Sequence, residues 1–121
     1  MAIRTILAVD DSPTDLQFFT EVLTAKGYQV LTASSGEEGI EKARNEKPDL
    51  ILMDVVMPGL NGFQATRKLQ QDEATRAIPV IICTNKTQET DRIWGLKQGA
   101  RDYVTKPVDT AELLSKIAAA A

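Results

Sequence analysis

Four strand-like runs in this chain each end in a side chain that can bind a metal ion or a phosphate. These side chains are an acidic pair, a single acid, a hydroxyl and an amine, at Asp10 with Asp11, Asp54, Thr84 and Lys106. Mg²⁺ binds one or two carboxylates and keeps waters that a phosphate can replace, and an aspartate can act as a nucleophile. An ammonium and a hydroxyl can bind phosphoryl oxygens. The set therefore predicts Mg²⁺-dependent transfer of a phosphoryl group to Asp54.

Each of these residues also has an ordinary structural explanation. Lys106 could form a structural ion pair with Asp54, Thr84 could cap the helix after it, and the acidic pair could lie in a solvated loop. However, two carboxylates about 4 Å apart repel by roughly 4 kcal/mol at an effective dielectric near 20, so a cluster must bind a cation, protonate or spread apart. Their joint occurrence at strand ends favours one site.

The elements that must position these residues alternate between strand and helix. The run at 50–53, between Pro48 and Pro58, is apolar throughout, as in a parallel strand buried on both faces. Strands are expected at 6–9, 30–31, 50–53, 78–84 and 102–105, and helices beginning near residues 13, 36, 63, 88 and 110. This alternation predicts one α/β domain, residues 1–121, with a flavodoxin-like, doubly wound parallel sheet of order 2-1-3-4-5 and five helices. That order would bring the four strand ends together.

Local signals give finer expectations for the helices. Ser12 and Ser35 are each followed three residues later by an acid, which predicts capping boxes; for the first helix this acid is Asp15. The third helix is expected to be short because residues 70–72 are all polar. Trp94, in the fourth helix, could lie on a partner-binding face, but core packing is the preferred expectation.

Composition excludes several classes of protein. The chain has 14 Lys and Arg against 17 Asp and Glu, a net charge of −3 and no basic block, so no nucleic-acid partner is expected. Cys83 lies in an apolar run and is expected to be a buried, inert thiol. No segment resembles a signal peptide or a membrane span, so we expect a soluble cytoplasmic protein without a membrane partner.

These motifs resemble, in order and spacing, those of the receiver domain of two-component response regulators. The matching segments lie at 9–12, 52–54, 57–59 with Gly62, 80–84, 99–103 and 106–107, and the resemblance covers essentially the whole chain. It is closest to the stand-alone, CheY-like kind. The segments 57–67 and 98–103 are further similar to PilH-type regulators of type IV pilus twitching motility.

The resemblance implies a role for each site residue. Asp54 would take a phosphoryl group from phosphohistidine on a CheA-like sensor histidine kinase. The implied Mg²⁺ ligands are Asp11, Asp54, the backbone carbonyl of Val56 and, through water, Asp10. Lys106 and Thr84 would bind the phosphoryl group. Thr84 would then move toward it and Tyr103 would turn inward, which would change a target-binding surface on the fourth helix, fifth strand and fifth helix. The protein would catalyse only its own modification.

Three positions depart from the commonest family pattern. Asn85 is larger than the residue usual there, and neither Val56 nor Lys86 offers an acid or an amide to orient an attacking water. We therefore expect slow self-dephosphorylation.

Four functions are alternatives to a phosphorylation-switched regulator. They are an interaction module that works without phosphate, a phosphate sink, a Mg²⁺-dependent phosphohydrolase and a flavin carrier. The complete set of site residues argues against the first, whereas nothing in the sequence separates a sink from an effector. The phosphohydrolase lacks its general acid, since that position is Val56, and the flavin carrier lacks a phosphate loop after the first strand.

Overall fold

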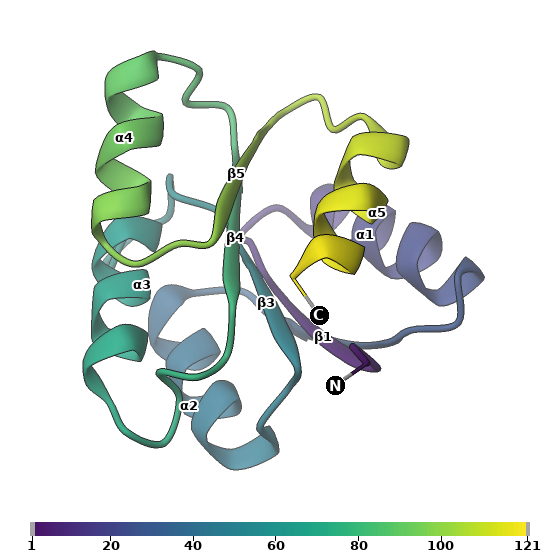
Figure 1. Ribbon diagram of the computed structural model, residues 1–121, viewed down its shortest axis with the longest axis horizontal. Helices are drawn as coiled ribbons and strands as arrows, with labels where there is room; N and C mark the ends of the chain where they lie inside the picture. The colour runs from purple at the N-terminus through teal and green to yellow at the C-terminus, as the bar shows by residue number, and fades with distance from the viewer. Residues whose placement is uncertain (1, 121) are drawn as a thin grey trace.

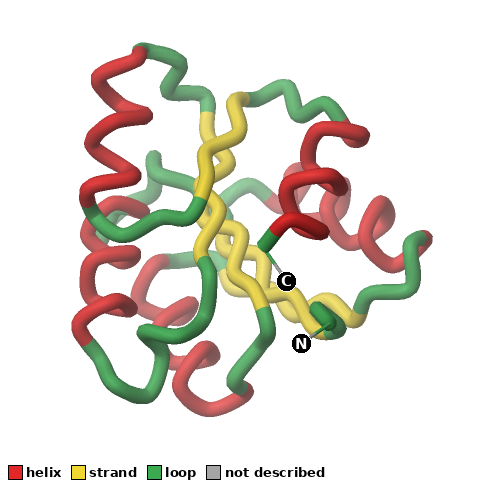
Figure 2. The backbone as a smooth tube through the Cα atoms, in the orientation of Figure 1, coloured by secondary structure: helices red, strands yellow, loops and turns green. Residues whose placement is uncertain are grey.

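The computed structural model describes residues 2–120. It shows a five-stranded parallel sheet with helices on both faces (Figures 1 and 2). The elements in chain order are β1 (Thr5–Val9), α1 (Pro13–Ala25), β2 (Gln29–Ala33), α2 (Gly36–Glu46), β3 (Leu50–Met53), α3 (Gly62–Gln71), β4 (Val80–Thr84), α4 (Glu89–Lys97), β5 (Asp102–Thr105) and α5 (Thr110–Ala119). The strand order is β2-β1-β3-β4-β5. The predicted flavodoxin-like fold is therefore confirmed.

Each face of the sheet has its own hydrophobic core. Figure 1 shows α1 and α5 on one side of the sheet and α2, α3 and α4 on the other. Because successive residues of a strand point to opposite faces, Leu50 and Leu52 pack toward α1 and α5, whereas Ile51 and Met53 pack toward α2 and α3. All four residues of β3 are buried, which explains why this strand is apolar throughout.

The predicted N-caps form, although the two predicted boxes are not reciprocal. The hydroxyls of Ser12 and Ser35 accept hydrogen bonds from the backbone N–H groups three residues later. The Glu38 carboxylate, however, accepts from the backbone N–H of Ser34 (2.7 Å) rather than from that of Ser35. The reciprocal box occurs instead at α3, between Asn61 and Gln64.

One of the finer expectations holds and one is wrong. The helix α3 has 10 residues and is shorter than α1 (13) and α2 (11), although it includes the polar residues 70–71. Trp94 does not pack in the core, because half of it (50 %) is exposed. The residue of α4 that faces the sheet is Gly95, where a Cβ atom would lie only 2.8 Å from Cδ1 of Ile82. Successive helical residues are about 100° apart around the axis, so Trp94 turns outward.

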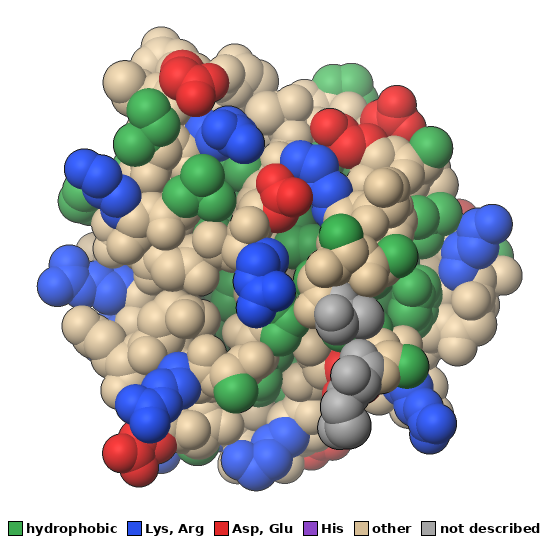
Figure 3. Space-filling model, in the orientation of Figure 1, with side chains coloured by type: hydrophobic (Ala, Val, Ile, Leu, Met, Phe, Trp, Pro, Cys, Tyr) green, Lys and Arg blue, Asp and Glu red, His purple; other side chains and the backbone are tan. Residues whose placement is uncertain are grey.

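The surface agrees with the composition. Figure 3 shows Lys and Arg side chains spread singly over the viewed face, with acidic and neutral groups between them. This face therefore presents no continuous basic patch for a nucleic-acid backbone. None of the helices within residues 2–120 combines the length and the apolar character needed to cross a bilayer.

Candidate functional site

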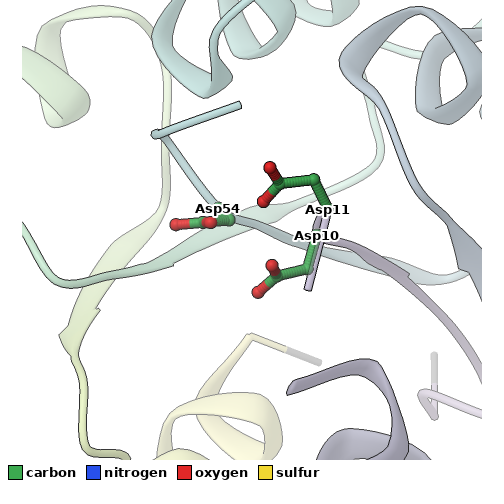
Figure 4. A group of neighbouring side chains, drawn as sticks. All are labelled: Asp10, Asp11 and Asp54. Atoms are coloured by element: carbon green, nitrogen blue, oxygen red, sulfur yellow. The ribbon is translucent and has the colours of Figure 1, made fainter. Parts of the chain in front are cut away.

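The three acids predicted to form the site converge beyond the ends of β1 and β3. In the parallel pairing Val9 lies opposite Met53, so the residues that follow them, Asp10 and Asp54, leave the sheet side by side. One carboxylate oxygen each from Asp10, Asp11 and Asp54 lies within 4.8 Å of the others, and the three side chains point to the same side of the strand ends (Figure 4). Asp10 and Asp54 are buried, whereas Asp11 is exposed.

The donor set fits a hard cation such as Mg²⁺. All three side chains offer oxygen, and two of them are fixed by backbone N–H groups. Asp10 Oδ1 accepts from Ser12 (2.9 Å), and Asp54 Oδ1 accepts from Val55 (2.8 Å). The Val56 carbonyl accepts no hydrogen bond from residues 2–120, so its oxygen is available for a ligand. An all-oxygen set with carboxylates is the kind that Mg²⁺ and Ca²⁺ take.

The pKa of Asp54 is raised above its ordinary value of 3.8. Burial is the largest cause, and the neighbouring charge of Asp10 adds to it; Lys106, the Val55 N–H and the Thr84 hydroxyl act in the opposite direction. Both dominant causes disfavour the charged form. A cation among the acids would relieve both.

Lys106 reaches this cluster from the end of β5. Its backbone N–H donates to the Thr84 carbonyl (2.8 Å), and its bond to Pro107 is cis, as the resemblance implied. The ammonium lies 3.7 Å from Asp54 Oδ2, but it lies closer to Asp10 Oδ2 (2.7 Å) and Asp15 Oδ2 (2.8 Å). Burial alone would lower the pKa of Lys106, but its hydrogen bonds to Asp10 and Asp15 outweigh burial and raise that pKa.

Asp15 is a residue of this cluster that the sequence reasoning missed. We interpreted it only as the acid of a capping box. The available signal was its place in the first turn of a helix that directly follows the acidic pair, since the first turn of such a helix lies at the same sheet edge as Lys106.

The sequence matches a known protein family. The family model of the response regulator receiver domain matches residues 6–118. The chain belongs to this family.

Individual relatives of this receiver domain agree with the assignment. Protein PilH of Pseudomonas aeruginosa is 62% identical over 112 residues, which cover 93% of each chain. Chemotaxis protein CheY4 of Vibrio cholerae superposes with a TM-score of 0.91 at 30% identity, covering 99% of this chain and 100% of that one. The receiver domain of sensor histidine kinase PA1611 from Pseudomonas aeruginosa, solved with a magnesium ion coordinated in its active site cleft, is 34% identical with a TM-score of 0.87, covering 96% and 95%.

Membership gives the general role of the chain. Receiver domains are signalling modules of two-component systems that accept a phosphoryl group, bind Mg²⁺ at an acidic pocket and interact with histidine kinases and downstream targets. Receiver domains are in general non-enzymatic signalling modules.

Two further residues of this receiver domain lie between the acidic cluster and α4. Thr84 is buried at the end of β4, and its hydroxyl accepts a hydrogen bond from the Lys86 N–H (3.4 Å). The Tyr103 hydroxyl donates to the Lys86 carbonyl (2.8 Å), and only 4 % of Tyr103 is exposed. Burial raises the pKa of Tyr103 to about 12, so the hydroxyl stays protonated as a donor. Tyr103 is therefore turned inward in this structure.

The positions that depart from the family pattern line the rim of the site. Val56 and Asn85 are exposed. The Lys86 ammonium lies 3.9 Å from an Asp91 carboxylate oxygen on α4. Cys83, by contrast, is buried, as expected, and burial raises the pKa of its thiol to about 12.

Proposed function

We propose that residues 1–121 form a single receiver domain of a response regulator that accepts a phosphoryl group on Asp54. The donor would be phosphohistidine on a CheA-like sensor histidine kinase in the cytoplasm. The observation that carries this proposal is the convergence of Asp10, Asp11 and Asp54 around one point with Lys106 only 3.7 Å from the Asp54 carboxylate. The 62% sequence identity to PilH supports a role in the signalling that controls type IV pilus twitching motility.

The roles of the residues follow from their chemistry. Asp11, Asp54 and the Val56 carbonyl would hold Mg²⁺ directly, with Asp10 acting through water, and the ion would neutralise charge on the phosphoryl oxygens. A carboxylate oxygen of Asp54 attacks phosphorus as the phosphorus–nitrogen bond breaks, and the imidazole leaves with the electron pair. Lys106 stabilises the negative charge on the transferred group through its own positive charge, and the Thr84 hydroxyl does so by donating a hydrogen bond.

The output would pass through Thr84 and Tyr103 to α4, β5 and α5. Three apolar side chains of α4, Ile93, Trp94 and Leu96, are exposed there. A rearrangement of the loop after Thr84 would change how they are presented to a downstream target protein.

Incubation with acetyl phosphate and Mg²⁺, followed by intact mass spectrometry, tests the main proposal. Acetate would leave as the phosphoryl group bonds to the aspartate. We expect one phosphoryl adduct on the wild type and on Asp91→Ala, a matched aspartate control on α4, and none on Asp54→Ala. Chelation of Mg²⁺ should prevent the adduct. An adduct that persists on Asp54→Ala would reject Asp54 as the acceptor.

A further inference from the structure

Lys106 has one more acidic partner than its predicted role requires. Its ammonium is 2.7 Å from Asp10 Oδ2 and 2.8 Å from Asp15 Oδ2, both within hydrogen-bond distance, whereas Asp54 Oδ2 lies 3.7 Å away. An ammonium has three N–H donors, and two of them are thus committed to carboxylates other than the phosphoryl acceptor. The lysine is therefore held closer to Asp10 and Asp15 than to Asp54.

The backbone of α1 fixes Asp15 in this position. Pro13 begins the helix, and the Ser12 hydroxyl accepts a hydrogen bond from the Asp15 N–H (3.3 Å). In a reciprocal capping box the carboxylate of Asp15 would accept the Ser12 N–H, but that N–H donates to Asp10 Oδ1 (2.9 Å). The Asp15 carboxylate is therefore free for Lys106, and a negative charge in the first turn of a helix is favourable there.

The two carboxylates that hold Lys106 differ in their environment. Asp10 is almost fully buried, whereas 38 % of the Asp15 side chain is exposed and only 9 % of the Lys106 side chain is. Water screens the exposed partner, so the contact between Lys106 and Asp15 is the weaker restraint and the one that can be released at low cost.

We propose that Asp15 is a positioning residue that competes with the phosphoryl group for Lys106 and so lowers the affinity of the site for that group. This inference rests on the proposed function of Asp54. Asp15 touches neither the phosphoryl group nor the predicted metal ligands, and it acts only through the lysine. When a phosphoryl group is bound to Asp54, the ammonium moves from Asp15 toward a phosphoryl oxygen.

Titration with beryllofluoride and Mg²⁺, read by ¹⁹F NMR, tests the competition. Beryllofluoride occupies the place of a phosphoryl group on an aspartate without a covalent transfer. Asp15→Asn removes the charge and keeps the size of the side chain, and we expect it to bind beryllofluoride about threefold to fivefold more tightly than the wild type, as for loss of a partly exposed ion pair. Asp15→Glu keeps the charge, so its affinity should return toward that of the wild type.

Glu21→Gln is the matched control. Glu21 lies six residues further along α1 than Asp15, and its carboxylate accepts a hydrogen bond from the Gln17 side chain. The substitution removes the same charge without touching Lys106 and should bind like the wild type. An equal or lower affinity for Asp15→Asn, an Asp15→Glu variant that behaves like Asp15→Asn, or an equal gain in Glu21→Gln would each overturn the inference. Failure of the wild type itself to bind beryllofluoride would instead reject the proposed function.

Discussion

Replacement of Asp54 by Asn is expected to stabilise the metal-free protein, even though it removes the central residue of the site. Asn has the same shape, and its oxygen can still accept the hydrogen bond that Val55 donates to Asp54 Oδ1 (2.8 Å). The variant therefore loses mainly a charge that is buried beside other acids. The raised pKa of Asp54 has the same meaning, since it shows that the fold disfavours the charged form.

The size of the effect follows from the distances. At an effective dielectric of 20, Lys106 at 3.7 Å attracts the Asp54 charge by about 4.5 kcal/mol, and Asp10, within 4.8 Å, repels it by at least about 3.5 kcal/mol. Exposed Asp11, screened by water, adds about 1 kcal/mol of repulsion. The charge–charge terms thus nearly cancel, and the cost of removing the Asp54 charge from water decides the sign. We expect Asp54→Asn to raise the free energy of unfolding by about 1–2 kcal/mol.

Urea unfolding with a chelator and with Mg²⁺ measures this effect. Mg²⁺ at ten times its dissociation constant should stabilise the wild type by about 1.4 kcal/mol, and Asp54→Asn should gain clearly less. Glu73→Gln, which removes one charge from the exposed turn before β4, is the control and should keep the full Mg²⁺ response. An Asp54→Asn variant no more stable than the wild type in chelator would refute the electrostatic reasoning.

Three further outcomes are expected. Val56→Asn should shorten the half-life of the phosphoryl group on Asp54, measured by mass spectrometry over time, because an amide at this exposed rim can orient an attacking water; an unchanged half-life would count against this. Gly62→Ala should lower the free energy of unfolding in urea by about 3 kcal/mol, since its Cβ would lie 2.0 Å from the Asp54 backbone oxygen, and no loss would contradict the close approach. Asp49 Oδ2 accepts hydrogen bonds from the backbone N–H groups of Thr5 and Arg4, and the pKa of Asp49 is below its ordinary value of 3.8. Its stabilisation is present above pH 3.8 and is lost as the pH falls through the lowered value, so Asp49→Asn should be less stable than the wild type at pH 7, with a difference that shrinks in acid; a difference independent of pH would be the contrary result.

The strand ends could be predicted from the sequence because buried parallel strands leave little ambiguity. An apolar run that stops at a charged residue fixes where the strand leaves the sheet, as it does at Asp54. Once the strands are parallel, their carboxyl ends must share one edge, so topology brings Lys106 close to the acidic cluster that includes Asp10, 96 residues away along the chain.

The partners chosen by long side chains could not be predicted in the same way. A lysine spans several ångströms with many rotamers, and the sequence does not show which of three nearby carboxylates its ammonium reaches. The orientation of α4 was obscure for a related reason. Its apolar residues Ile93, Trp94 and Leu96 do not form one stripe, and the residue that packs against the sheet is a glycine, which carries no hydrophobic signal.

The hydrogen bond from Tyr103 to the Lys86 carbonyl joins a side chain of β5 to the backbone just beyond Thr84. The ring and that backbone therefore cannot be displaced independently while the bond is kept. A protein that docks on this side of the molecule and favours one arrangement of the ring also favours one arrangement of the loop. By thermodynamic linkage, if such a partner favours the phosphorylated form of Asp54 by some factor, phosphorylation of Asp54 would strengthen the binding of that partner by the same factor.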